Sequence, residues 1–204
     1  MRIYDTAFAA SLTAAASEGL APVWFAHFTA KNRETGAAVQ MGLWSGDETI
    51  SVAVETPEGG SETRTYIGGC GMWVDGVQYV ADLTDQPVNV TLSQIAPDAQ
   101  QLIRGYDLRL AGCEIHATTR TGGALTSIPQ LMWVGIVDEG PISTPAAGGE
   151  GGISLTVRSE LMMQLMATNP AKSSDQHQRR RLAGDRFSEY AGTIGSRQVQ
   201  WYRG

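Results

Sequence analysis

The fold is decided by the stretch Leu108-Arg-Leu-Ala-Gly-Cys-Glu-Ile-His-Ala-Thr118 and by its return, Leu131-Met-Trp-Val-Gly-Ile-Val-Asp-Glu139. Both runs are rich in apolar residues, and the turn Thr121-Gly-Gly123 follows the first of them. Apolar and β-branched runs on either side of a glycine turn are typical of a β-hairpin. We therefore expect a long strand over 108–118 that pairs with a strand over 131–139.

Short apolar runs separated by glycine and proline continue along most of the chain, which contains 24 Gly and 8 Pro in 204 residues. This punctuation is typical of a fold built from many strands. Two more hairpins are predicted, one joining 23–29 to 38–44 and one around Asp75-Gly76 that joins 72–74 to 77–80. The segment Gly68-Gly-Cys-Gly71 indicates a bulge or a close backbone contact. Further strands are expected at 50–54, 63–67, 88–92 and 152–158.

Three short helices accompany these strands. The first spans 5–18 and can be capped by Asp5 or Thr6, the second begins with Pro97 at its first position, and the third spans 159–166. The apolar cluster of the third helix fits either core packing or a soft contact between subunits. Nine or ten strands against three helices predict a mainly β fold with accessory helices (α+β), in the form of a β-barrel or sandwich. The apolar cluster of the third predicted helix consists of Leu161, Met162, Met163, Leu165 and Met166.

We expect three parts in the chain: an N-terminal helix over 1–20, a β-barrel or sandwich body over 21–170, and an extended C-terminal arm over 171–204. The arm is polar and ends close to an aromatic pair, Trp201-Tyr202. A segment of this composition cannot bury enough apolar surface to fold alone. Its order must therefore come from a surface on which it lies.

Charge is distributed unevenly between these parts. The chain has a net charge of −6, but residues 172–204 contain seven basic and three acidic side chains, which gives +4 and leaves −10 for the rest. Two interpretations remain open: a solvated basic tail, or an arm that docks on an acidic neighbour. An acidic body disfavours direct binding of nucleic acid, since phosphate contacts need basic surface. Such a body suits the wall of a channel through which DNA passes without sticking.

The sequence offers few candidates for catalysis or metal binding. Cys113 and His116 point to opposite faces of one strand, and Glu114 with His116 supplies only two ligands. Cys70 and Cys113 are expected to be buried free thiols. Asp82, Asp85 and Asp107 could suggest a carboxylate pair, but aspartate is common in turns. Because hydrolase and phosphate-loop motifs are also missing from the sequence, we expect no enzyme activity, no cofactor and no metal site.

Nothing in the sequence predicts a membrane span or a cleaved export signal. No apolar run approaches the roughly 20 residues that cross a bilayer, and the first twenty residues lack a basic, strongly hydrophobic signal profile. We therefore expect synthesis and assembly in the cytosol.

Seven short motifs occur along the chain in an order that resembles a known family. Segments 21–44, 88–118 and 131–204 are similar to bacteriophage and gene-transfer-agent tail proteins, the hub or baseplate-type subunits of long tails. None of the motifs is a catalytic signature. They are Met41-Gly-Leu-Trp-Ser-Gly46, Leu92-Ser-Gln-Ile-Ala-Pro97, Arg104-Gly-Tyr-Asp107, Arg109-Leu-Ala111, Glu114-Ile-His116, Gly149-Glu-Gly151, and Ser173-Ser-Asp-Gln176 through Gly184-Asp-Arg-Phe187.

This resemblance implies a structural protein of the tail tip or baseplate, a ring that joins the tail tube to distal tip proteins around an open DNA channel. It implies a homo-oligomer, with a trimer favoured and a hexamer possible, whose partners are the adjoining tail-tube, distal tail and tip or fibre proteins. DNA would pass without specific binding, and no small-molecule substrate is implied. The location would be the virion tail, after assembly in the cytoplasm of a host bacterium. The alternative is a tail-associated cell-wall hydrolase.

Two sets of residues are expected to carry this role. Glu55, Glu58 and Glu62 are concentrated in one loop and could face the channel. Arg179-Arg-Arg181 could be solvated, could form ion pairs with another chain, or could contact nucleic acid. Together with its neighbours in the arm, this run predicts a subunit interface at Asp175, Arg179, Arg180, Arg181, Asp185, Arg186, Phe187 and Trp201.

Overall fold

The computed structural model describes residues 4–78, 84–140, 142–143, 151–161 and 174–196. The chain divides into two compact units, Met1–Leu165 and Met166–Gly204. The first unit is a curled half-barrel of β-strands with helices α1 and α2, and the second contains the short helix α4. The predicted mainly β fold with accessory helices is therefore confirmed.

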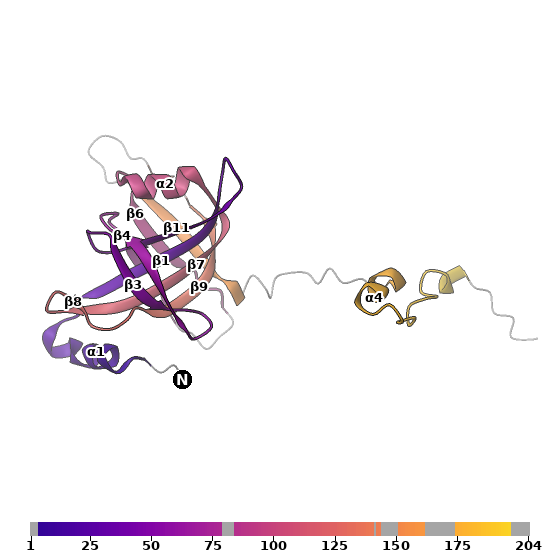
Figure 1. Ribbon diagram of the computed structural model, residues 1–204, viewed down its shortest axis with the longest axis horizontal. Helices are drawn as coiled ribbons and strands as arrows, with labels where there is room; N and C mark the ends of the chain where they lie inside the picture. The colour runs from indigo at the N-terminus through magenta and orange to yellow at the C-terminus, as the bar shows by residue number, and fades with distance from the viewer. Residues whose placement is uncertain (1–3, 79–83, 141, 144–150, 162–173, 197–204) are drawn as a thin grey trace, which may run out of the picture. The chain divides into compact units, whose positions relative to one another are not determined.

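One curled sheet forms the first unit (Figure 1). Its strands follow the order β3-β4-β2-β1-β7-β9-β11-β6-β5, while β8 pairs with β7 and β10 pairs with β11. All described pairings are antiparallel except the short contact between β2 and β4. The bounds are β1 (Pro22–Asn32), β2 (Ala38–Trp44), β3 (Ile50–Glu55), β4 (Ser61–Ile67), β5 (Trp73–Asp75), β6 (Val88–Ser93), β7 (Tyr106–Thr121), β8 (Ala124–Leu125), β9 (Gln130–Glu139), β10 (Ile142–Ser143) and β11 (Gly152–Ser159).

The neighbouring strands β1 and β7 form the centre of the sheet. Strand β1 is buried on both faces from Phe25 to Phe28, and β7 is buried on both faces from Ile115 to Thr119. Phe25 pairs with His116 and Phe28 pairs with Cys113. Because side chains alternate along a strand, the two strands divide the interior of the unit into two cores. Phe28 and Cys113 belong to the larger core, whereas Phe25 belongs to the smaller one.

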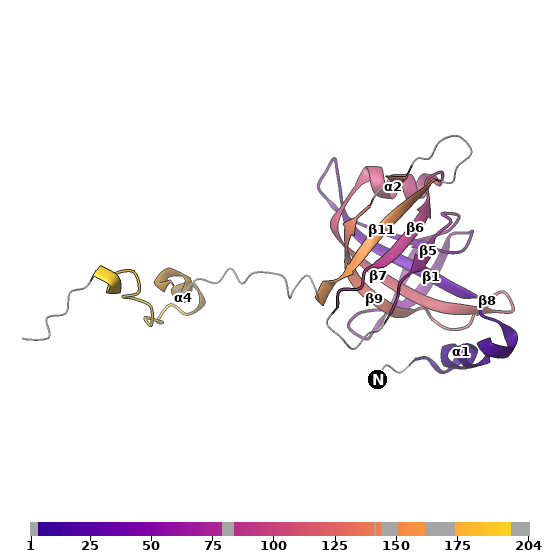
Figure 2. The same ribbon diagram turned by 180° about the vertical axis from the view of Figure 1, so that it is seen from behind.

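The larger core fills the concave side of the half-barrel. It joins β1 and β7 to β6, β9 and β11, and Leu102 of α2 (Pro97–Gly105) is fully buried in it. Figure 2 shows α2 over one end of β6 and β11. The side chains buried in this core include Phe28, Leu43, Val88, Val90, Leu102, Ile115, Ile153, Leu155 and Val157.

The smaller core lies between the β3–β4 hairpin and the other face of β1 and β2. Three aromatic rings dominate it: Phe25 stacks on Trp44 with centroids 5.5 Å apart and meets Tyr66 edge-on at 5.0 Å. Aromatic pairs of these geometries stabilise a core beyond the area that they bury. The hairpin is therefore held to the sheet mainly by packing, since β4 touches β2 over only two residue pairs.

The helices follow their predicted end signals. Helix α1 (Thr6–Glu18) has Asp5 as its N-cap, whose Oδ1 accepts from the amides of Ala7 and Phe8. Helix α2 has Pro97 in its first turn. Helix α1 contacts β7, where the hydroxyls of Ser11 and Thr119 lie 2.7 Å apart.

One predicted hairpin is wrong. The strand at Trp73–Asp75 pairs with β6 at Val88–Ser93, and Val77 and Gln78 are not in a strand. The sequence signal at Asp75-Gly76 does mark a turn, because Gly76 has a positive φ of 82°, but the chain leaves the sheet there. Of the strand predicted at 77–80, residues 79 and 80 lie outside the described residues.

The close contact predicted at Gly68-Gly-Cys-Gly71 is confirmed. A Cβ on Gly68 would lie 2.5–2.6 Å from backbone atoms of Gly46, Asp47 and Glu48. The third predicted helix is described only at Glu160 and Leu161, because Ser159 ends β11 and 162–173 lie outside the described residues.

Two glycines on paired strands provide a test of how tightly the sheet is packed. A Cβ on Gly135 would lie 2.2 Å from the Arg158 carbonyl oxygen, whereas one on Gly112 would meet nothing closer than Thr29 Cβ at 3.9 Å. We expect Gly135→Ala to lower the free energy of unfolding by about 1–3 kcal/mol, as overpacking does. Gly112→Ala should leave it unchanged or raise it by up to about 1 kcal/mol. Urea denaturation measures both, and equal effects would contradict this packing.

Candidate functional site

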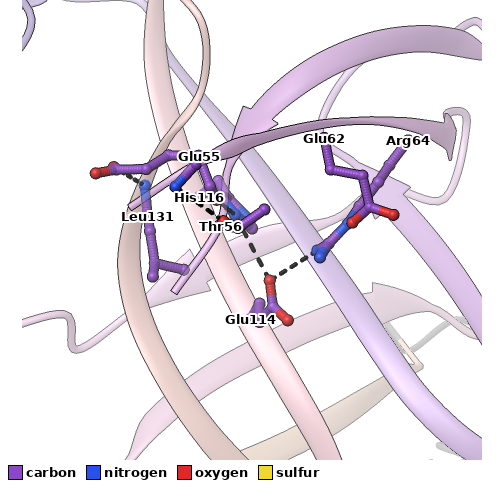
Figure 3. A network of polar contacts seen from close by, with 8 residues as sticks. Glu55, Thr56, Glu62, Arg64, Glu114, His116 and Leu131 are labelled. Atoms are coloured by element: carbon purple, nitrogen blue, oxygen red, sulfur yellow. Dashed lines mark hydrogen bonds and ion pairs between the residues drawn. The ribbon is translucent and has the colours of Figure 1, made fainter. Parts of the chain in front are cut away.

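A polar cluster joins the β3–β4 hairpin to β7 on the side of the smaller core (Figure 3). Arg64 of β4 is at its centre, with one guanidinium nitrogen 2.7 Å from Glu114 Oε2 and another 2.8 Å from Glu62 Oε2. The Arg64 side chain is 12% exposed and that of Glu114 is 20% exposed, so this ion pair is largely screened from water. Burial opposes the charge of Arg64, but its hydrogen bonds to Glu114 and Glu62 outweigh that effect and raise its pKa.

His116 ties the same strand to the end of β3. Its Nε2 lies 2.8 Å from the Glu55 carbonyl oxygen, and because a carbonyl only accepts, Nε2 carries the hydrogen. Burial lowers the pKa of His116 to about 4, so the ring is neutral near pH 7. The Glu55 carboxylate in turn accepts from the amide of Leu131 at 2.9 Å. These bonds connect the end of β3 to β7 and to the start of β9.

His27 and Tyr66 complete the buried part of the cluster. Burial is the main cause that lowers the pKa of His27, with Arg64 adding to it. Burial also raises the pKa of Tyr66 to about 12. Nδ1 of both histidines and the Tyr66 hydroxyl are buried without a hydrogen-bond partner. The ion pairs and hydrogen bonds of the cluster hold β3, β4 and β7 together.

The cysteines take no part in this cluster. Cys113 lies in the larger core and His116 on the opposite side of β7, as the sequence pattern predicts. Cys70 and Cys113 are both buried and free, and burial raises the pKa of each thiol. Thiols held in the protonated form are poor nucleophiles.

Two of the three candidate aspartates have other partners. Asp85 forms an ion pair with Arg158 at 3.2 Å, and Asp107 accepts from the amide of Arg109 at 3.2 Å. Asp82 lies outside the described residues. In the described part of the chain, no three of the His, Cys, Asp and Glu side chains are placed to hold a metal ion.

A groove opens beside the polar cluster, on the outer face of β7 and β9. Its volume is about 330 Å³, and it is bounded by the turn after β3, by Glu114 and by Glu160. Among the described residues, its lining combines apolar side chains, such as Leu110, Val134 and Ile136, with three carboxylates and no Lys or Arg. The groove is therefore apolar in its walls and acidic in its charge. A larger hollow between α1 and the end of β7 has a single charged residue in its lining, Arg120.

Leu110 at the edge of this groove has an unusual backbone. Between Thr29 and Lys31 of β1 the pairing with β7 jumps from Gly112 to Asp107, so several residues of β7 bulge out. Within this bulge Leu110 has a φ of 58° and a side chain 55% exposed. A left-handed leucine costs roughly 1–2 kcal/mol, and such outliers often mark functional surfaces.

The three predicted channel residues differ in their roles. The Glu55 carboxylate accepts a hydrogen bond from the backbone amide of Leu131 in β9. Glu62 forms an ion pair with Arg64, and its side chain remains 56% exposed. Glu58 is exposed in the turn between β3 and β4 and lines the groove. Whether any of them faces a channel stays a prediction.

The predicted interface residues lie in the second unit, on and after α4 (Asp175–Arg181). Arg179 forms an ion pair with Asp175 at 2.9 Å and lies 3.7 Å from Glu189. Arg180 and Arg181 form no ion pair within the described residues, and their role at an interface stays a prediction. Asp185 accepts from the amide of Phe187 at 3.0 Å, while Arg186 is exposed. Trp201 lies outside the described residues.

The described part of the arm has almost no interior. Between residues 174 and 196, Ser188 is the one buried residue. The apolar side chains are left in contact with water. They are Leu182 (65% exposed), Phe187 (90%), Tyr190 (63%) and Ile194 (70%).

Comparison of the sequence with protein-family models finds no match, and neither does comparison with curated proteins. Among the described helices, none has the length and apolar character needed to cross a membrane.

Sequence reasoning missed the centre of the polar cluster. Arg64 and Tyr66 lie in the strand predicted at 63–67 and His27 in the strand predicted at 23–29, and nothing in the sequence connects these two strands. The alternation Glu62, Arg64, Tyr66 places all three on one face of β4 and was the available signal. Only the fold brings this face onto His27, which shares β1 with Phe25.

Stability should fall as the pH is lowered from 7.5 to 5, because the unfolded chain binds a proton at His116 that the folded chain excludes. With a folded pKa of about 4 against an ordinary value near 6.5, the loss is about 2 kcal/mol over this interval. His27 acts in the same direction. Urea denaturation of His116→Gln should show a shallower pH dependence, whereas the control His177→Gln, on the exposed face of α4, should not. Equal slopes in all three proteins would contradict this account.

Replacing Arg64 should lower the free energy of unfolding more than replacing Glu62. Arg64→Met leaves Glu114 largely buried without its cation, and we expect a loss of about 2–3 kcal/mol, below the range for fully buried pairs because Glu114 is 20% exposed. Glu62→Gln, on the 56% exposed side, should cost less than Arg64→Met, because water already screens this carboxylate. Chemical denaturation at pH 7.5 compares the two. A larger loss for Glu62→Gln would be inconsistent with the geometry.

Proposed function

We propose that this protein is a structural subunit of a phage tail tip or baseplate, a hub ring that joins the tail tube to distal tip proteins and keeps the DNA channel open. The observation that carries the proposal is a basic arm, attached to an acidic β-rich body, whose described residues 174–196 form no core of their own. The order of the tail-hub motifs along the sequence supports it.

The arm supports an assembled protein for a physical reason. Phe187 and Tyr190 expose most of their rings within the arm, and burying one large apolar side chain stabilises by about 1.5–3 kcal/mol. An arm that buries only Ser188 gains none of this energy by itself. It gains that energy by docking on another subunit, which makes the arm a connector within a ring.

The body supports a channel wall rather than a nucleic-acid interface. The chain outside residues 172–204 has a net charge of −10, and like charge keeps DNA at a distance. A ring formed by one repeated heterologous contact closes with cyclic symmetry. We favour three copies, with six as the other arrangement that matches a tail tube, and we assign no substrate or cofactor.

The arm should be required for assembly and dispensable for folding of the body. A chain that lacks residues 171–204 should keep a melting temperature within about 4 °C of the full-length protein, since the deleted part adds no core. It should fail to enter tail particles when it replaces the full-length protein in cells that produce them. Circular dichroism measures the first property, and immunoblots of purified particles measure the second.

Two results would count against the proposal. Normal incorporation of the shortened chain would remove the arm as the connector. Absence of the full-length protein from purified tails would remove the tail location itself.

A further inference from the structure

We infer that the groove on the outer face of β7 and β9 receives arginine side chains of α4 from a neighbouring copy of this protein. The inference rests on the proposed function and names the surface through which one copy of the ring grips the next. It depends on the chemistry of the groove, on the charges that α4 leaves unpaired, and on the size of the opening.

The chemistry of the groove matches arginine. Arginine combines an apolar stem with a planar guanidinium that binds carboxylates through two hydrogen bonds. Val134 and Ile136 offer apolar contact for the stem, and Glu58 and Glu160 add carboxylates at the same opening. Glu114 is already held by Arg64, so the charge presented to an incoming side chain comes chiefly from the exposed Glu58. Among the described residues, no Lys or Arg lines the groove to repel a cation.

Helix α4 presents cations that its own unit leaves unmatched. Arg179 is paired with Asp175, but Arg180 and Arg181 are exposed and form no ion pair within the described residues. The arm from 172 onward has a net charge of +4 and the remainder −10, so the attraction between an arm and a body is favourable over the whole surface.

The size of the groove limits what enters it. The groove has a volume of about 330 Å³. An α-helix with its side chains is about 10–12 Å across and does not fit in that space, whereas one or two long side chains do. Helix α4 would therefore lie across the opening and insert its arginines. Leu110, exposed at the edge, would meet the apolar residues of the arm.

A photo-crosslink in the full-length protein tests this contact directly. Leu110 is replaced by p-benzoylphenylalanine, and two isotopically distinct preparations are mixed at high concentration and irradiated. We expect mass spectrometry to find links between copies from position 110 to residues 175–186. The same probe at Ile95, which is 86% exposed on the body but does not line the groove, should give no such link.

Charge reversal supplies the matched control. Glu58→Lys with Glu160→Lys should lower the yield of the link between copies by about tenfold, equivalent to 1.4 kcal/mol. Glu34→Lys with Glu48→Lys changes the net charge equally, at exposed positions outside the groove, and should change the yield by less than about twofold. Adding Arg180→Glu and Arg181→Glu to the groove variant should restore the link.

The outcomes separate this inference from the proposed function. Links from position 110 to another part of the body, links only within one copy, or no link would each overturn the inference. Equal losses in the two charge variants would do the same, because general attraction would then explain the contact. If the groove variant still enters tail particles at the normal level, the groove contact is refuted while the tail location stands. If the link forms but the protein is absent from tails, the proposed function fails and the contact remains.

Discussion

The structure depends on the pairing of β1 with β7. Where these strands are buried on both faces, one face packs in the larger core and the other lies on the side of the smaller core. Strands β6, β9 and β11 and helix α2 pack on one face of the β1–β7 pair and complete the larger core. The β3–β4 hairpin packs on the other face and completes the smaller core. Because the hairpin meets β2 over only two residue pairs, aromatic packing on Phe25 and the ion pair at Arg64 hold it in place.

The same constraint produces the surface that we connect with function. The bulge in β7 exposes Leu110, and the hairpin held by Arg64 places the turn with Glu58 beside it. Glu114 of β7 is paired with Arg64, while Glu58 is exposed at the edge of the groove. The polar cluster thus supports the proposed docking surface.

Most of the fold could be predicted from the sequence because strands and caps are local signals. Apolar and polar residues alternate at 50–54 and predict a strand, and Pro97 predicts the start of a helix. Both elements are confirmed. The partner of Trp73–Asp75 was predicted wrongly because a favourable turn dipeptide outweighed a more distant strand. The polar cluster depends on His27, Arg64 and Glu114 meeting across three strands, and no local pattern encodes that meeting.

The most direct test of the central claim is electron microscopy of the assembled tail at a resolution that traces side chains. The account predicts a closed ring at the tail tip in which the arm of each copy leaves its own body and places arginines of α4 in the groove of the next. A ring whose arms lie on their own bodies, or a tail tip that does not contain this chain, would contradict it.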